Sequence, residues 1–576
     1  MNIKHIQVSS FRGIRELDWT VEGSVACLIG PNDSTKSSII EAVELVLSPR
    51  WNPSLSDADF YQGDTKQPIE IRVVVAGLPQ KLMVEEKFGL ALQGWTPDGR
   101  ISGMLEEGCE AVLHIQLRVD ESLEPEWQVL TASGESKRIS HSDRRLLGMA
   151  RVGAEVDRHL SWARDSALSR ATAGGSGEAS SILAGASRAA VEAAGKTMAT
   201  DLDNAAKQAQ KNAELLGLEK LPPFHPALDQ DALIGHSGAI TLHAEGVPLR
   251  QAGLGTRRLV AMGLETFAVP EGAILLLDEV EHGLEPHRVR HLLRGLQLCT
   301  DKTKPGSQRL LPGCGQVLMT THSPIVAEEL DASQLYVVRS NSGVTTVNRV
   351  DSSLQGTVRH ASEALLSRRV IVCEGKTEVG MCRAMEERVW TNNHDGRSLA
   401  YAGVSLLDGC GDRAPKYALE LARLGYSVAL FADSDVDKKS PDIGDTQLEE
   451  AGVRVIRWGD QCSTEDRVSA DLPADRWKSI VLAAIETRCE ESVLGAVNYQ
   501  LRESGQSTVD ADDLKSDQEA SKVLRQAVGR AAKTKGWFKT IDLGEQLGCV
   551  VAEALPRIES TDLAGRLREL EEWAYG

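Results

Sequence analysis

The sequence has no long hydrophobic run and no cysteine motif. No apolar stretch approaches the roughly 18 to 20 residues of a membrane span, and the opening MNIKHIQVSSFRG lacks the apolar centre of a signal peptide. The ten cysteines are scattered without a C-x-x-C pair, which argues against a zinc site or a disulfide framework. We therefore expect a cytoplasmic protein without a membrane segment, with reduced and mostly buried thiols.

An excess of positive charge is also missing, because the formal net charge is −19. This charge does not suggest a protein coated with basic residues for nucleic-acid binding. It does not exclude nucleic acid either, since carboxylates that hold metal ions count as negative here and basic residues can cluster locally. Short basic clusters occur at Arg257 and Arg258, at Arg368 and Arg369, and in KTKGWFK, although each alone is more typical of a solvated face.

The length of 576 residues is too great for one hydrophobic core, so we expect two or more domains in an α/β chain. Patterns of strand, loop and helix recur in residues 1–149, 223–364 and 365–460. Residues 150–222 are rich in alanine and polar residues and favour helix. They predict a helical insertion that serves either for dimerisation or as a layer on its own domain. Residues 461–576 also predict mostly helix.

The stretch GPNDSTKSS, residues 30–38, lies between a predicted strand and a predicted helix. Gly30, Lys36 and Ser37 have the order of the phosphate-binding loop G-x-x-x-x-G-K-[ST], in which backbone N–H groups surround the phosphates, the lysine reaches the β and γ oxygens and the serine binds Mg²⁺. Thr35 replaces the second glycine, whose backbone geometry a β-branched residue disfavours. With Thr35 at this position, we still expect the loop to bind nucleotide, but we expect less efficient ATP hydrolysis. The predicted ATP-binding residues of the loop are Asn32, Lys36, Ser37 and Ser38.

Three further segments carry residues suited to nucleotide chemistry. In ILLLDEVEHGLEPH, Asp278 can hold Mg²⁺ through water and Glu279 can orient the attacking water. In LMTTHSPIV, His322 stands at a strand end where it can sense a γ-phosphate, and LRQAGLGTRRL places Gly253 and Gly255 just before an apolar helix. Together with the loop, these segments predict a complete nucleotide site.

The four segments, in this order, resemble the ATP-binding-cassette heads of the RecF and SMC type, with Walker A, signature, Walker B and histidine switch. The resemblance implies that the signature of one subunit completes the ATP site of another, so that Gly253 to Arg257 act in trans across a head-to-head dimer and Glu279 is the general base. The opening VSSFRGI resembles the first strand of such heads, whose arginine, here Arg12, lies near the phosphates.

A second group of carboxylates follows two predicted parallel strands. Glu374 ends one strand in RVIVCEGKTEV, and Glu378 lies one helical turn further on. Asp433 and Asp435 follow the strand of YSVALFADSDVDKKS. Because parallel strands bring their C-terminal ends to one edge of a sheet, we expect the four carboxylates to converge. Such oxygen ligands suit Mg²⁺ or Mn²⁺, and two ions could support phosphodiester cleavage.

The pattern E-G-x-T-E followed by D-x-D resembles a Toprim domain. A RecF-like head followed directly by a Toprim domain resembles the OLD (overcoming lysogenization defect) nucleases, which include the nuclease subunit of the Gabija anti-phage system. The family pattern implies that Glu465, less surely Asp466, is a further metal ligand and that Lys539 stabilises charge on the scissile phosphate. It also implies metal-dependent cleavage of DNA by a dimer or larger oligomer.

We therefore predict an ATP-regulated, metal-dependent DNA endonuclease in anti-phage defence or DNA processing. The alternative is an ATP-gated sensor or scaffold whose nuclease works only with a partner, such as a helicase or an effector. A topoisomerase would need a tyrosine domain and a primase a zinc module, and the sequence offers neither. Asp437 and Asp408 remain open as metal ligands or polar turn residues.

Overall fold

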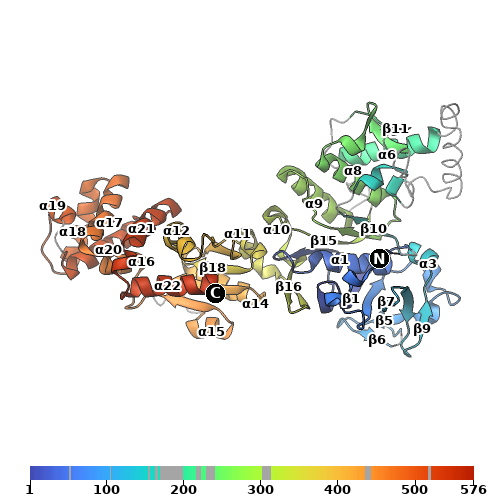
Figure 1. Ribbon diagram of the computed structural model, residues 1–576, viewed down its shortest axis with the longest axis horizontal. Coiled ribbons are helices and arrows are strands. Elements are labelled where there is room, and N and C mark those ends of the chain that lie inside the picture. Colours follow the sequence, from blue (N-terminus) through green and yellow to red (C-terminus); the bar gives the residue numbers. More distant parts are fainter. Residues whose placement is uncertain are drawn as a thin grey trace. The chain divides into compact units, whose positions relative to one another are not determined.

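The computed structural model describes residues 1–576 except for 51–52, 104, 154–155, 163–165, 169–198, 216–221, 229–239, 301–312, 435–442 and 517–519. The chain forms two compact units, Met1–Ser362 and Glu363–Gly576. The first unit lies from blue to yellow-green in Figure 1 and the second from yellow to red. In the part of the chain that is described, no helix is long and apolar enough to cross a membrane.

The first unit is built on a 14-stranded sheet, and the five strands at one end of this sheet are parallel. In order across the sheet, these strands are β10 (Met149–Val152), β14 (Ala273–Leu277), β15 (Cys314–Thr320), β3 (Val25–Ile29) and β16 (Leu335–Asn341). Every residue of β3 and β14 is buried, as expected for parallel strands that are covered on both faces. The carboxyl ends of β3, β14 and β15 therefore lie at one edge of the sheet, where the loops carrying Lys36, Asp278 and His322 begin.

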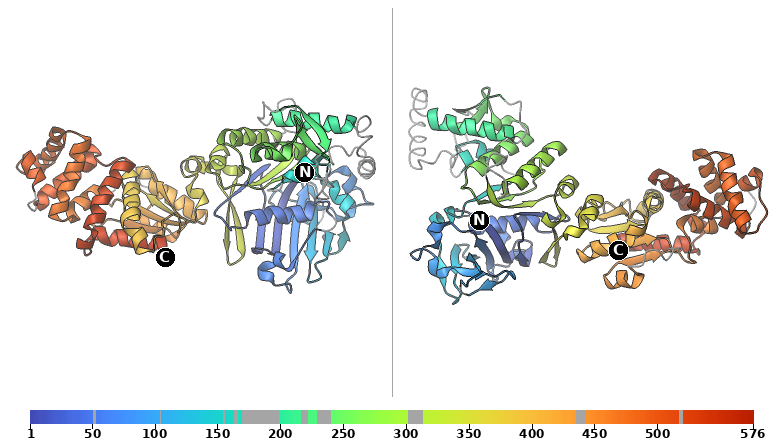
Figure 2. Two further views of the ribbon diagram at one scale, coloured as in Figure 1. Left: turned by 45° about the horizontal axis from the view of Figure 1, so that its top comes forward. Right: turned by 180° about the vertical axis from the view of Figure 1, so that it is seen from behind.

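The sheet continues into a mainly antiparallel part, whose blue strands run side by side in the left view of Figure 2. The strands follow in the order β17 (Val344–Arg349), β2 (Ile14–Thr20), β1 (Asn2–Phe11), β4 (Ile69–Ala76), β7 (Glu110–Val119), β5 (Gln93–Trp95) and β6 (Ile101–Ser102). Strands β8 (Pro125–Leu130) and β9 (Ser136–Arg138) extend it from β7. Helix α1 (Lys36–Leu47) packs on β1, β4 and β15 through its buried apolar residues.

Helices α8 (Leu254–Phe267), α9 (Pro286–Thr300) and α10 (Pro324–Glu329) follow the signature, Walker B and histidine segments. A small sheet of β11 (Phe224–Leu228), β12 (Ile240–Ala244) and β13 (Val247–Pro248) precedes α8. The segment 150–222, predicted as a helical insertion, begins inside β10 and contains helix α6 (Ala199–Leu215). Much of this segment lies outside the described residues, so its proposed role in dimerisation stays a prediction.

The second unit has a four-stranded parallel sheet in the order β19 (Val404–Asp408), β18 (Arg369–Cys373), β20 (Ser427–Ala432) and β21 (Arg454–Arg457). Helices α12 (Lys376–Met385), α14 (Ala414–Arg423) and α15 (Asp445–Glu450) connect these strands. The parallel arrangement brings the residues after β18 and β20 to the same edge of the sheet.

In the described part of the chain after this sheet, seven α-helices follow: α16 (Thr464–Asp471), α17 (Ala474–Thr487), α18 (Glu490–Glu503), α19 (Ala511–Lys515), α20 (Lys522–Lys535), α21 (Ile541–Ala554) and α22 (Asp562–Tyr575). Helix α21 packs against α12, α16 packs against α20, and α22 returns to β20 and β21. One apolar core joins these helices to the sheet. The predicted α/β class with a helical C-terminal region is confirmed.

Candidate active sites in the two units

The loop of residues 30–35 has the backbone of a phosphate-binding turn. Gly30 has φ +141°, and a Cβ atom there would lie 2.6 Å from the carbonyl oxygen of Val338. Lys36 folds back so that its Nζ donates to the carbonyl oxygens of Gly30 at 2.9 Å and Pro31 at 2.7 Å. Burial, and secondarily the charge of Arg339, lower the pKa of Lys36 to about 8. The lysine thus lies inside the loop, while Asn32 is exposed and Ser38 half-buried beside it.

Thr35 has φ 69° and ψ 10°, so it occupies the left-handed region that its glycine counterpart would adopt without strain. Its hydroxyl donates to the carbonyl oxygen of Ser34 at 2.6 Å and lies 3.0 Å from the hydroxyl of Thr345 on β17. These contacts support a backbone conformation that a β-branched residue disfavours. The replacement of glycine by Thr35 therefore places a β-branched residue in a left-handed backbone conformation.

A chain of hydrogen bonds joins the Walker A, Walker B and histidine segments. The Ser37 hydroxyl donates to Asp278 Oδ1 at 2.9 Å, and the Thr320 hydroxyl donates to the same oxygen at 2.6 Å. Thr320 ends β15, two residues before His322. Burial, and next the charge of Lys36, lower the pKa of His322. The segments carrying Ser37, Asp278 and His322, which the sequence predicted to form one nucleotide site, thus lie side by side.

Glu281 also lies at this site, although no sequence motif singled it out. Its carboxylate accepts from the Thr321 hydroxyl and from the His322 backbone N–H, both at 2.7 Å. Glu281 therefore fixes the backbone of the histidine segment. Only its position in the Walker B loop could have suggested a role.

The signature segment opens helix α8. Gly253 is the residue before the helix, whereas Gly255 lies in its first turn rather than ahead of it as predicted. A Cβ atom on Gly255 would lie 2.4 Å from the carbonyl oxygen of Gly283, so glycine permits close packing against the Walker B loop. Arg257 pairs with Asp157 at 2.5 Å. The predicted action of this segment in trans stays a prediction.

Arg12, which the resemblance places near the phosphates, forms ion pairs within its own unit. Its guanidinium contacts Asp59 at 2.9 Å and also pairs with Glu41 of α1. These contacts hold the turn between β1 and β2 against the helix that follows the phosphate loop.

In the second unit, Glu374 and Asp433 meet at the edge of the parallel sheet. The backbone N–H of Asp433 donates to Glu374 Oε2 at 2.7 Å, although the two residues stand far apart in the sequence. Glu378, in the first turn of α12, is buried and accepts from the Gly375 N–H at 2.9 Å. Of the four carboxylates expected to converge, these three lie at the same edge of the parallel sheet.

Helix α16 adds Glu465 to this edge. Thr464 donates to Asp433 Oδ1 through its backbone N–H at 2.8 Å and through its hydroxyl at 2.9 Å. The next residue, Glu465, has a side chain only 1% exposed, and neither carboxylate oxygen accepts a hydrogen bond. Lys539 lies 3.3 Å from Glu465 Oε1. A buried carboxylate with this little compensation is suited to binding a cation.

The carboxylates at this edge act on one another electrostatically. Burial, and then the charges of Glu378, Glu374 and Glu465, raise the pKa of Asp433 to about 9. Burial and the charge of Glu465 raise the pKa of Glu378 to about 7. The same negative charges raise the pKa of Lys539 against the opposing effect of its burial. The described carboxylates at this edge therefore carry more negative charge than Lys539 offsets.

Not every predicted residue joins the cluster. Asp466 caps α16 by accepting from the Ser463 hydroxyl at 2.8 Å, and Asp408 accepts from the Cys410 N–H at 2.9 Å. Asp435 and Asp437 lie outside the described residues. Within the described ranges, no three His, Cys, Asp or Glu side chains lie close enough together to hold a metal ion. Glu374 accepts from the Asp433 N–H, whereas Glu465 lies beside Lys539.

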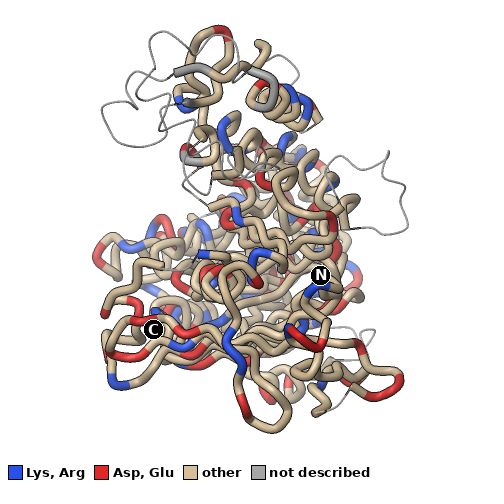
Figure 3. Tube along the Cα trace, turned by 90° about the vertical axis from the view of Figure 1, so that its right-hand side faces the viewer, with Lys and Arg blue, Asp and Glu red and all other residues tan. Residues whose placement is uncertain are grey.

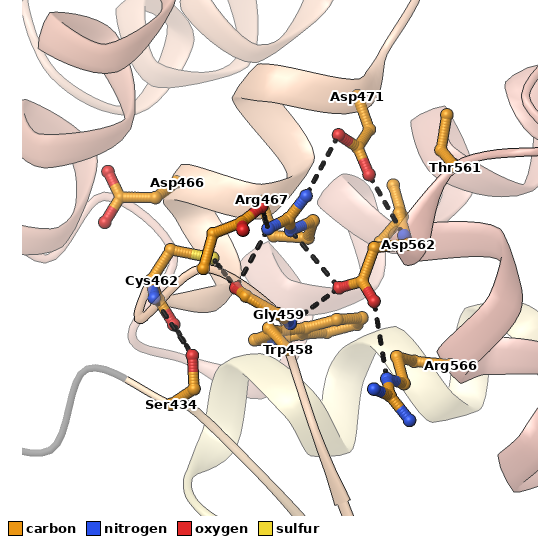
Figure 4. Close-up of polar contacts among 12 residues, drawn as sticks. Ser434, Trp458, Gly459, Cys462, Asp466, Arg467, Asp471, Thr561, Asp562 and Arg566 are labelled. Carbon is orange, nitrogen blue, oxygen red and sulfur yellow. Dashed lines mark hydrogen bonds and ion pairs between the residues drawn. The ribbon is translucent and has the colours of Figure 1, made fainter.

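Arg467, which the sequence did not single out, joins α16 to the C-terminal helix α22 (Figure 4). Its buried guanidinium donates to the Gly459 carbonyl oxygen at 2.9 Å and lies 3.3 Å from Asp471 and 3.5 Å from Asp562. Asp562 in turn accepts from the Gly459 N–H at 2.7 Å. This network holds the helix that carries Glu465.

Comparisons with known proteins give a family match in each of the two units. Residues 129–328 match a family described as an AAA domain, putative AbiEii toxin, type IV TA system. Residues 365–435 match the Toprim domain of overcoming lysogenization defect protein-like sequences. The chain therefore has an ATPase domain followed by an OLD-like Toprim domain. The predicted resemblance to OLD proteins is therefore confirmed, and residues 1–76 also match a family of unknown function.

A curated relative of this chain is the OLD nuclease of Thermus scotoductus, which is 37% identical over 75 residues. The match covers 12% of the chain and only 14% of that relative's length. Similar solved structures include an SMC head bound to the C-terminal winged-helix domain of ScpA, with 14% identity, a TM-score of 0.36, and coverage of 60% of this chain and 97% of the other.

The SMC head domain of Thermotoga maritima is 16% identical, with a TM-score of 0.31 and coverage of 61% and 100%. The recombination mediator RecF is 14% identical, with a TM-score of 0.35 and coverage of 60% and 98%. At such scores these similarities do not by themselves establish a common fold.

Proposed function

We propose that this protein is a metal-dependent DNA endonuclease whose cleavage is controlled by ATP in its first unit. The observation that carries the proposal is the buried Glu465 carboxylate, which accepts no hydrogen bond and lies beside Glu374, Glu378 and Asp433 at one edge of the Toprim sheet. The similarity to an OLD nuclease supports the same reaction class.

The donor set at this edge fits a hard divalent cation, Mg²⁺ or Mn²⁺, because it consists of carboxylate oxygens. The residues that would hold it are Glu374, Glu378, Asp433, Asp435 and Glu465. A bound divalent ion would supply Lewis-acid activation of water and of the phosphodiester. Lys539, anchored beside the buried Phe538, donates its Nζ protons to a phosphate oxygen and stabilises the negative charge that develops there.

In the first unit, Lys36 binds the β and γ phosphates of ATP, while Ser37 and Asp278 would hold its Mg²⁺. Glu279 accepts a proton from the attacking water, and His322 contacts the γ-phosphate. Gly253 and Gly255 act on the nucleotide of a second copy, so that ATP closes a homodimer or a larger homo-oligomer. DNA is the substrate, and anti-phage defence or DNA processing, with a helicase-like or effector partner, is the setting we infer.

The distribution of charge supports DNA binding at a limited region of the protein and not over most of its surface. Lysines and arginines are interspersed with aspartates and glutamates along the trace in Figure 3. The formal net charge of −19 would repel DNA from most of the surface, so binding depends on local basic residues such as Lys539 and on bound metal ions.

The test is cleavage of supercoiled plasmid by the full chain with Mg²⁺, Mn²⁺ or EDTA, each with and without ATP. We expect nicking that requires metal and is lost in Asp433→Ala. The matched control is Asp475→Ala, because Asp475 is an exposed carboxylate that pairs with Arg557 at 3.0 Å. Lys36→Ala should keep cleavage but remove its response to ATP.

Cleavage that survives in Asp433→Ala would contradict the assigned nuclease site. If the wild type binds DNA and ATP but cleaves under no condition, the alternative of a sensor or scaffold that needs a partner would be favoured instead.

A further inference from the structure

Glu279 has a backbone conformation that costs free energy. Its φ of 48° lies in the left-handed region, which residues with a Cβ atom rarely adopt. Glu279 directly follows Asp278 at the end of β14, where the chain turns out of the sheet. Something must hold this turn, because an unsupported glutamate would relax to an ordinary conformation and move its carboxylate.

Both peptide groups that flank Glu279 are held on their oxygen side by one residue, Arg258. Its Nη2 donates to the carbonyl oxygen of Asp278 and, at 2.7 Å, to that of Glu279. Its Nη1 lies 3.4 Å from the carbonyl oxygen of Gly153. Arg258 is 1% exposed, so these bonds are formed away from water.

The same two peptide groups are held on their nitrogen side by Thr320. The Glu279 N–H donates to the Thr320 hydroxyl oxygen at 2.8 Å, and the Val280 N–H donates to the Thr320 carbonyl oxygen at 3.0 Å. Arg258 and Thr320 therefore fix the planes of both peptides. Since φ and ψ of Glu279 are the rotations between these planes, the two residues together determine its conformation.

We propose that Arg258 is a positioning residue for ATP hydrolysis, which holds Glu279 in its left-handed conformation and so directs the carboxylate of the general base. This inference rests on the ATP-hydrolysis part of the proposed function. Arginine suits the role because its planar guanidinium can donate to two carbonyl oxygens at once, whereas lysine ends in a single ammonium group.

Because of its position in the chain, Arg258 also connects Glu279 to the signature segment. Arg258 lies in the first turns of α8, the helix that begins with the signature segment. A displacement of that segment by the nucleotide of a second copy would reach Glu279 of its own subunit through Arg258. The base is thereby tied to the state of the signature helix.

The first experiment compares steady-state ATP hydrolysis and nucleotide affinity in the full-length protein. Arg258→Met should lower kcat by about 100-fold, in line with the loss of an oriented general base, with the nucleotide Kd changed less than about 3-fold because Lys36 and Ser37 are untouched. Arg258→Lys should lie between Met and wild type, since one carbonyl can still be contacted.

The matched control is Arg144→Met. Arg144 is also buried and also donates to two backbone carbonyl oxygens, those of Ser48 and Arg50, but it lies at the other end of α1 from the phosphate loop. This control should lower the melting temperature without lowering kcat per folded molecule. A kcat of Arg258→Met that stays within about 2-fold of wild type, against the about 100-fold loss expected of a base, would overturn the inference.

The second experiment does not depend on turnover, so it decides the inference even if the wild type hydrolyses no ATP and the proposed function fails. Glu279→Gly removes the strain, because glycine adopts positive φ readily. We expect Arg258→Met to lower the melting temperature more in the Glu279→Gly background than in the wild-type background, because only in the wild type does release of the strain offset part of the lost hydrogen bonds. Equal losses in the two backgrounds would mean that Arg258 does not hold the conformation of Glu279.

Discussion

Thr35 is the residue at which the phosphate loop departs from its usual sequence. Its left-handed φ of 69° should cost free energy, and this cost can be measured by substitution. In the interior of a helix, alanine is normally more stable than glycine by about 1 kcal/mol. At this position we expect the reverse, because a left-handed conformation costs a residue with a Cβ atom about 1 to 2 kcal/mol. Thr35→Gly should therefore be about 1 kcal/mol more stable than Thr35→Ala in denaturant unfolding.

The control for this comparison is a Gly/Ala pair at Ser38, which lies within α1. There the alanine variant should be the more stable one. The same order at both positions would show that Thr35 carries no backbone strain in solution.

Asp433 should make the stability of the folded protein depend on pH. Its pKa is raised to about 9 in the folded protein from an ordinary value of 3.8, so the folded state holds a proton that the unfolded state releases. Without divalent metal, stability should fall as the pH rises from about 5 to 8, by up to about 1.4 kcal/mol per pH unit for one such proton. Asp433→Asn should show a smaller fall, because asparagine stays neutral.

The measurement is thermal unfolding in EDTA at several pH values, with Asp475→Asn as the control for removing a carboxylate. Parallel curves for wild type and Asp433→Asn would contradict the raised pKa. Added Mn²⁺ should reduce the fall in the wild type, because a bound cation favours the ionised carboxylate.

At the scale of elements, α12 and α21 pack with their backbones in close approach. A Cβ atom on Gly380 would lie 2.3 Å from the carbonyl oxygen of Ile541, and one on Gly544 would lie 2.7 Å from that of Thr377. Gly380→Ala should therefore separate the helices and destabilise the second unit by about 1 to 3 kcal/mol. Because Glu378 lies two residues away, plasmid cleavage should fall as well.

Gly565→Ala in α22 is the matched control, since a Cβ atom there meets nothing within 4 Å. It should stabilise the protein by about 0.5 to 1 kcal/mol through helix propensity. Denaturant unfolding of both variants checks the pair, and a neutral Gly380→Ala would show that the helices are not this close in solution.

At the scale of the whole molecule, the two units have separate hydrophobic cores, and the sites we propose for ATP and for metal lie in different units. A ligand stabilises the unit that binds it, by about 2.7 kcal/mol at a concentration of 100 Kd. We expect calorimetry to show two transitions, of which ATP raises one and Mn²⁺ the other. Lys36→Ala should abolish only the ATP shift and Asp433→Ala only the Mn²⁺ shift. A single transition shifted by both ligands would show that the units unfold as one.

The sequence by itself determined those features that depend on residues close together in the chain. The loop around Lys36, the pair Asp278 and Glu279, and the strand ends at Glu374 and Asp433 could be predicted because a buried strand followed by polar residues has one ordinary meaning in a parallel sheet. The direction of the strands then sufficed to predict that Glu374 and Asp433 would meet.

Only the tertiary structure decided what holds these residues in place. Arg258 and Thr320 clamp Glu279, and Arg467 ties α16 to α22, through partners that are distant in sequence. Their side chains resemble any other arginine or threonine until folding brings buried carbonyl and carboxylate oxygens to them. The physical reason is that a buried polar group must find its partner wherever the fold places one, and sequence spacing does not record that position.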